Sequence, residues 1–168
     1  MYNNNTQLCT PGKWLHETEA PPNTEEGALY LGYRCDTHLG FTVRSYNDTP
    51  VCILQFSTEV TYAEAISSCR SFNSYLYTTK TLDKFYLLQT LVTNWLWVGL
   101  DDIQTEGKLV WVDDGQELDP ELISNIFSPG EPNDISGFED CTEIFIGSLT
   151  LNDNICDKYF RYVCEQRM

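Results

Sequence analysis

Residues 95–102 read WLWVGLDD, a short apolar run that ends in two carboxylates. Trp, Leu and Val favour extended backbone, and an apolar run of this length between polar residues is typical of a buried strand. Further short strand candidates follow at 108–112 (KLVWV), 141–146 (CTEIFI) and 161–165 (RYVCE). The second half of the chain is therefore predicted to form a small antiparallel sheet.

Two amphipathic helices are predicted before residue 95. Thr61 and Glu64 match the T-x-x-E pattern of a capping box, and apolar residues then recur at helical spacing as far as Cys69. Thr81 is the candidate cap of a second helix that continues to about Val92. Helices that precede a sheet in this way indicate an α+β fold.

Residues 1–50 differ in composition from the rest and are predicted to be an N-terminal extension to a domain at 51–168. Segment 10–27 is rich in Pro, Gly, Thr and Glu, which is typical of loops. Residues 28–34 (ALYLGYR) are a candidate strand or hairpin, and residues 51–56 (VCILQF) are the candidate strand that opens the domain.

The chain of 168 residues is strongly acidic, with 10 Lys and Arg against 25 Asp and Glu and a formal net charge of −15. This charge argues against nucleic acid and anionic membrane surfaces as partners. No run of 18 apolar residues is present, so we expect no insertion into a membrane. The start, MYNNNTQLC, lacks the charged and apolar regions of a signal peptide.

The cysteines are widely spaced and contain no C-x-x-C pair, which favours disulfides over zinc or redox chemistry. Disulfides and the two sequons at Asn4 and Asn47 predict a secreted or extracellular glycoprotein. Because the number is odd, one thiol is left unpaired or links to a second chain. The seven cysteines stand at positions 9, 35, 52, 69, 141, 156 and 164.

Oxygen-bearing side chains gather in two long polar stretches, 113–140 and 147–160, and just after the strand at 95–100. So many carboxylates would repel one another if they converged without a cation. Oxygen ligands without His or Cys select calcium over transition metals. An acidic loop taken alone is usually solvated surface, so the order and placement of the motifs must support a calcium site.

That order resembles the C-type lectin-like domain across residues 51–165. The family's WIGL motif corresponds to WVGL at 97–100, and its EPN motif to residues 131–133. The W-x-W-type strand corresponds to VWVD at 110–113, and the acid before a cysteine corresponds to EDC at 139–141. The WND motif corresponds to LND at 151–153, and the final strand with its cysteine corresponds to YVCE at 162–165.

The resemblance implies a long-form carbohydrate-recognition domain with calcium as cofactor. The principal calcium site, which also binds sugar hydroxyls, would be formed by Glu131, Asn133, Glu139, Asn152 and Asp153. An auxiliary site would share Glu139 and add Asp102, Glu106 and Asp134. The EPN motif implies a cis peptide at Pro132 and mannose-type ligands, namely mannose, N-acetylglucosamine, glucose or fucose.

The resemblance also implies disulfides Cys69–Cys164 and Cys141–Cys156. Long forms add an N-terminal bridge, for which Cys35–Cys52 is the first choice and Cys9–Cys35 or Cys9–Cys52 the alternatives. With the first choice, Cys9 is left for an interchain bond, which predicts a homodimer or higher oligomer.

Four apolar residues near these motifs carry open questions. Phe127 and Leu151 stand where the family has tryptophans, either as conservative core replacements or as a source of altered loop packing. Ile135 and Phe138 flank the site, either as contacts for a sugar face or as loop anchors.

The function predicted is binding of glycans or glycoproteins rather than catalysis. His16 and His38, both in the extension, are the only histidines, so no acyl-transfer triad is evident. The alternatives are a protein-binding domain in which calcium is structural, and a mineral- or ice-binding protein.

Overall fold

The computed structural model describes residues 28–30 and 33–168. The predicted loop at 10–27, the sequon at Asn4 and the proposed interchain Cys9 lie outside these residues. The described helices are α1 (Tyr62–Ser71), α2 (Leu82–Leu91) and α3 (Pro120–Ile126), with short 3-10 turns at Thr37–Leu39 and Ile135–Gly137. The strands are β1 (Ala28–Tyr30), β2 (Tyr33–Cys35), β3 (Thr42–Tyr46), β4 (Thr49–Val60), β5 (Tyr75–Leu76), β6 (Leu96–Asp101), β7 (Val110–Trp111), β8 (Cys141–Phe145), β9 (Thr150–Asn154) and β10 (Phe160–Gln166).

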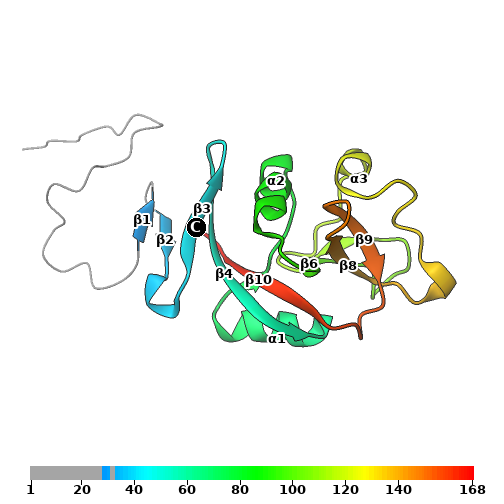
Figure 1. Cartoon of the computed structure of the whole chain (residues 1–168), viewed down its shortest axis with the longest axis horizontal. Coiled ribbons are helices and arrows are strands. Elements are labelled where there is room, and N and C mark those ends of the chain that lie inside the picture. The colour runs from blue at the N-terminus through cyan, green and yellow to red at the C-terminus, as the bar shows by residue number, and fades with distance from the viewer. Residues whose placement is uncertain (1–27, 31–32) are drawn as a thin grey trace, which may run out of the picture.

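The main sheet has the order β3-β4-β10-β6-β8-β9, with β5 also paired to β10 and β7 to β6. The long β4–β10 pair runs diagonally through the molecule, with α1 and α2 on opposite sides of it (Figure 1). Strands β1 and β2 form a separate antiparallel pair. The fold is therefore α+β, as predicted.

Strand β6 separates two apolar clusters, because alternate side chains of a strand point to opposite faces. Leu96, Val98 and Leu100 belong to the cluster beneath α2 and α3, whereas Trp97 belongs to the cluster beside α1. A Cβ atom on Gly99 would lie 2.5 Å from the carbonyl oxygen of Leu76. The glycine of the WVGL motif is thus required by the close approach of β5.

Local capping signals predicted the first two helices correctly. The side chain of Thr61 accepts from the backbone of Glu64, and the Glu64 carboxylate accepts from the Thr61 N–H at 2.9 Å. Thr81 caps α2 through the backbone N–H of Lys84. Tyr62, Ala65 and Cys69 are the buried face of α1, as their spacing indicated.

The structure corrects three expectations. A third helix, α3, begins at Pro120 within the predicted loop 113–140, where Asp119 caps it and accepts from the N–H of Glu121. The predicted loop 147–160 contains strand β9. The sheet is not purely antiparallel, since β6 and β10 run parallel. Of the two alternatives given for segment 28–34, the structure has the hairpin, since β1 and β2 pair antiparallel.

Three disulfides form in the described chain, Cys35–Cys52, Cys69–Cys164 and Cys141–Cys156, which confirms the three predicted pairs. Phe127 and Leu151 are 5% and 0% exposed and lie in the cluster beneath α2 and α3. The two departures from the family's tryptophans are therefore core replacements. No helix in the described part of the chain has the length and apolarity needed to cross a membrane.

Candidate functional site

The EPN segment lies in the loop between α3 and β8, at the end of the molecule farthest from β1 and β2 (Figure 1). The start of this loop is attached to β9, because the Ser128 N–H donates to the Leu151 carbonyl at 2.9 Å. Its end is anchored by the Cys141–Cys156 disulfide. The Glu131–Pro132 peptide bond is cis, as expected.

Asp153 connects β9 to the EPN loop. Its Oδ2 atom accepts from the backbone N–H of Asn133 at 2.9 Å and of Asp134 at 2.6 Å. The residue is only 2% exposed, and its Oδ1 atom is buried without a hydrogen-bond partner in the described chain. A buried carboxylate oxygen without a donor is costly, so a cation at this position would satisfy it.

Glu131 lies against Asp153 with its carboxyl partly buried. Burial raises the pKa of Glu131 to about 7, with further increases from Asp153 and Glu139, while the Asn133 side chain opposes the shift. The Oε2 atom of Glu131 is buried and has no partner among the described residues. Four of the five predicted principal ligands therefore interact with one another.

Asn152, the fifth predicted ligand, lies beside Asp153 on β9. Its side-chain amide donates to the carbonyl oxygen of Asp153. The strand that was predicted as loop thus holds two candidate ligands in consecutive positions, one buried and one half-buried.

The predicted auxiliary ligands meet where the turn after β6 faces the EPN loop. The Asp102 N–H donates to the Asp140 carbonyl at 3.1 Å, and Asp102 Oδ2 accepts from the Gly107 N–H at 2.9 Å. Burial raises the pKa of Glu106, and the charges of Asp102, Asp134 and Asp140 raise it further. The sequence named Asp140 only as part of a motif, and the structure adds it to this acidic group.

Asp134 and Glu139 fasten the loop to itself. Asp134 Oδ1 accepts from the Glu139 N–H at 3.1 Å, and Glu139 Oε2 accepts from the Ile135 N–H at 3.0 Å. Glu139, which the two predicted sites share, and the auxiliary candidate Asp134 are therefore held near the turn at Ile135–Gly137.

The donor set of the described residues fits calcium chemically. It consists of carboxylate and amide oxygens, and a carboxylate oxygen of each of Asp102, Glu131 and Asp153 is buried without a partner in the described chain. Within residues 28–30 and 33–168, no group of three or more Asp, Glu, His or Cys side chains is arranged closely enough to hold a metal ion. A calcium shell would therefore need asparagine oxygens in addition to the carboxylates.

Glu143 is a residue at the site that sequence reasoning missed. It is 1% exposed on β8 and lies opposite Asn152 on β9. Burial raises its pKa to about 8, although hydrogen bonds with the side chains of Asn152 and Asn154 act in the opposite direction. The signal was an acidic residue at a core position of the apolar segment CTEIFI.

Ile135 and Phe138 are 62% and 66% exposed beside the candidate ligands. They are therefore not loop anchors within the described chain. Their side chains offer an apolar surface next to the acidic group.

The comparisons with known proteins place this geometry in a family. The family model for the lectin C-type domain matches residues 58–166, and the chain belongs to this family. C-type lectin domain family 4 member M of Pan troglodytes is 35% identical over 118 residues, which cover 68% of this chain and 25% of the relative. The chain thus corresponds to about a quarter of that relative's length.

Two solved structures show how widely the fold is used. The carbohydrate-recognition domain of cow CD23, in the presence of a GlcNAc2Man3 oligosaccharide, is 26% identical with a TM-score of 0.62, over 70% of this chain and 88% of that one. A calcium-independent type II antifreeze protein is 20% identical with a TM-score of 0.64, over 76% of this chain and 91% of that one. The second likeness concerns the fold alone.

Proposed function

We propose that this chain is an extracellular calcium-dependent lectin that binds mannose-type glycans, and that it acts by binding rather than by catalysis. The observation that carries the proposal is the state of Asp153, which orients the EPN loop with one carboxylate oxygen and keeps the other buried without a partner. Family membership and the likeness to the carbohydrate-recognition domain of cow CD23, determined in the presence of an oligosaccharide, support the same function.

The proposed principal calcium ligands are Glu131, Asn133, Glu139, Asn152 and Asp153. The proposed auxiliary ligands are Asp102, Glu106 and Asp134, with Glu139 shared. When bound, calcium supplies a Lewis-acidic contact for two vicinal hydroxyls of the sugar.

The ligand side chains also bind the sugar directly. The carboxylates of Glu131 and Glu139 accept hydrogen bonds from the hydroxyls, and the amides of Asn133 and Asn152 donate to them. Hydroxyls in equatorial positions present both a donor and an acceptor to this arrangement. The EPN order of acid and amide supports the mannose-type preference.

A glycan array with calcium and again with EDTA tests the function. We expect mannose-type glycans to be bound only with calcium, and Glu131→Gln to abolish this binding. A control variant, Glu117→Gln, changes an exposed carboxylate in an ion pair with Lys108 and should bind normally.

Other outcomes of the array favour the alternatives. If the chain binds calcium but no glycan on the array, the result favours a protein ligand, with calcium in a structural role. Adsorption to ice or carbonate that mannose cannot compete favours a surface-binding function, which the fold of the antifreeze protein accommodates.

A single shallow sugar site binds a monosaccharide with a dissociation constant of about a millimolar. Useful avidity requires several sites presented together. We propose that Cys9 links two copies of the chain. A dimer on a non-reducing gel that becomes a monomer on reduction supports this arrangement, whereas a monomer under both conditions contradicts it.

A further inference from the structure

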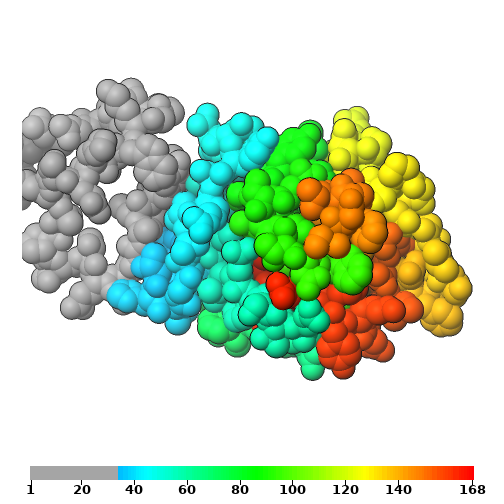
Figure 2. Space-filling view, viewed as in Figure 1, coloured from blue at the N-terminus to red at the C-terminus, as the bar shows by residue number. Residues whose placement is uncertain are grey.

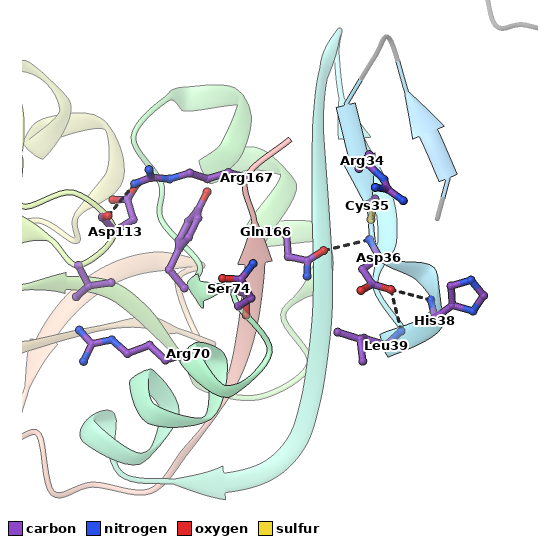
Figure 3. Close-up of a pocket in the computed structure, with 13 residues that line it drawn as sticks. Arg34, Cys35, Asp36, His38, Leu39, Arg70, Ser74, Asp113, Gln166 and Arg167 are labelled. Atoms are coloured by element: carbon purple, nitrogen blue, oxygen red, sulfur yellow. Dashed lines mark hydrogen bonds and ion pairs between the residues drawn. The ribbon is translucent and has the colours of Figure 1, made fainter. Parts of the chain in front are cut away.

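The described chain contains a cleft of about 1080 Å³ that is separate from the EPN loop. It lies between the segment that follows β2, the end of α1 and the carboxyl end of β10 (Figure 3). Figure 2 shows the blue and cyan segment that follows β2 on the left and the yellow segments that lead to the EPN motif on the right. The cleft is therefore a second concave surface, remote from the candidate calcium site.

The cleft concentrates positive charge in a protein of net charge −15. Three of the five arginines in the sequence line it, and they come from separate elements: Arg34 from β2, Arg70 from α1, and Arg167 from the residues after β10. Among the residues that the structure describes, the carboxylates that line the cleft belong to Asp36 and Asp113. Since acids outnumber bases in the whole chain, this excess of guanidinium groups is a local departure from the average surface.

Both carboxylates in the cleft are already engaged. Asp36 Oδ1 accepts from the backbone N–H of His38 at 3.1 Å and of Leu39 at 3.3 Å, so it caps a turn. Asp113 Oδ1 lies 2.7 Å from the ammonium of Lys80, and Asp113 Oδ2 lies 3.9 Å from the guanidinium of Arg167. Neither acid is paired with Arg70 in the described part of the chain.

Two arginines retain donors for a ligand. Within the described part of the chain, the Arg70 side chain makes no hydrogen bond or ion pair. Arg167 donates to the Asp113 carbonyl at 2.8 Å, lies 5.8 Å from the centre of the Tyr75 ring, and remains 67% exposed. A guanidinium has five N–H donors, so most donors of Arg167 remain available.

The wall between these arginines is built from fixed groups. Gln166 accepts from the Asp36 N–H at 3.1 Å and donates to the Phe72 carbonyl at 3.3 Å, and Figure 3 shows its amide beside Asp36. The Cys35–Cys52 disulfide holds the segment after β2 against β4. The cleft is thus preformed on both sides, which lowers the cost of ordering a ligand.

We propose that this cleft is a calcium-independent binding site for oxyanions, sulfate or phosphate, and in particular for an oligosaccharide that carries sulfate groups. The planar fork of a guanidinium matches the oxygens of such groups and binds them with paired charge-assisted hydrogen bonds. The volume of the cleft corresponds to a ligand larger than one inorganic ion. This site does not depend on the proposed lectin function.

Calorimetry in EDTA with the whole chain tests the proposal, because EDTA removes any contribution from calcium. The probes are a sulfated tetrasaccharide, the same tetrasaccharide without sulfate, and inorganic sulfate and pyrophosphate. We expect the sulfated sugar to bind, its affinity to decrease with salt, and the unsulfated sugar not to bind.

Variants separate the cleft from general charge effects. Arg70→Gln combined with Arg167→Gln should weaken binding about tenfold or more. The matched control is Arg44→Gln, which removes an exposed arginine on β3 outside the cleft and should leave binding unchanged. Both arginines of the double variant are exposed, and an unchanged melting temperature verifies that it folds.

The outcomes are distinct. The proposal is overturned if the Arg44→Gln control loses as much affinity as the double variant Arg70→Gln, Arg167→Gln. It is also overturned if the protein binds none of the anions. Inorganic sulfate or pyrophosphate that binds as tightly as the sulfated sugar, with loss in the double variant, supports the oxyanion site and identifies the free ion as its ligand.

Discussion

The carboxylate of Asp153 on β9 accepts a hydrogen bond from the backbone N–H of Asn133, 20 residues earlier in the chain, at 2.9 Å. The backbone conformation of the EPN loop therefore depends on the buried carboxylate of Asp153, which lies on β9 of the β8–β9 pair. Substitutions at either end of this contact should affect both loop order and calcium binding.

Asp153→Asn should reduce calcium affinity about a hundredfold or more, because it removes one negative charge and replaces an oxygen that holds the loop with an amide. Calcium titration by calorimetry measures the loss, and hydrogen exchange of the Asn133 and Asp134 amides measures loop order. Asp157→Asn, at an exposed position nearby, is the matched control. Normal calcium affinity in Asp153→Asn would contradict the assignment.

The pH dependence of calcium binding follows from Glu131, whose pKa is raised to about 7 by burial and by Asp153. A ligand carboxylate must lose its proton before it binds calcium. Below about pH 7, calcium affinity should therefore decrease by up to about tenfold per pH unit. Calorimetric titrations at several pH values measure the slope, and a flat profile contradicts the role of Glu131.

The calcium-free protein should show the opposite trend in stability. The pKa of Glu131 is above its ordinary value of 4.5 in the folded state, so folding favours the protonated form. Its contribution to stability is complete below that ordinary value and is lost as pH rises through about 7. Glu143, with a pKa of about 8, acts in the same direction.

We therefore expect the melting temperature in EDTA to rise as the pH is lowered from about 8 to about 6. Over the same pH range, the melting temperature of the calcium-loaded protein should fall. Scanning calorimetry under both conditions checks this. Parallel changes in the two series would show that Glu131 and Glu143 do not control the difference.

Sugar preference should depend on the positions of the acid and the amide in the EPN motif. The double variant Glu131→Gln, Asn133→Asp exchanges the acid and the amide and gives the order QPD, for which the resemblance to C-type lectins implies a preference for galactose. We expect binding to mannose-type glycans to decrease at least about tenfold and binding to galactose to increase. Unchanged preference on a glycan array would place specificity elsewhere, for example at Ile135 and Phe138.

The ion pair between Lys84 and Glu165 should contribute strongly to stability. The ammonium lies 2.7 Å from the carboxylate, with side-chain exposures of 13% and 8%. Lys84→Met should cost about 3 kcal/mol, because Glu165 would remain buried without its partner. Denaturant unfolding measures the change.

A matched control for this pair is Lys108→Met. Its ion pair with Glu117 is exposed on both sides, so the loss should be below about 1 kcal/mol. Burial raises the pKa of Glu165, and removal of Lys84 raises it further. The cost of Lys84→Met should therefore shrink on acidification as Glu165 takes up a proton, and a cost independent of pH would contradict this origin.

Features that depend on local chemistry or on the order of motifs could be predicted from the amino-acid sequence. The Thr61 capping box is a contact between near neighbours, so its pattern predicted the start of α1. The disulfide pairs and the cis peptide at Pro132 followed from the order of motifs in the family. The helix α3 was missed although Asp119 and Pro120 are helix-start signals, because its surroundings are polar.

The positions at which non-local partners meet could not be predicted from the sequence and depend on the folding of the whole chain. The segment TLNDN lacks an apolar alternation, and it becomes strand β9 because β8 supplies its hydrogen bonds. The same pairing places Glu143 opposite Asn152 and brings the Asp153 carboxylate to the EPN loop. The arginine cleft likewise joins β2, α1 and the end of β10, which are far apart in sequence. The spacing of apolar residues in the sequence indicates which face of a helix or strand is buried. The helix or strand that packs against this face is determined by the packing of the whole chain.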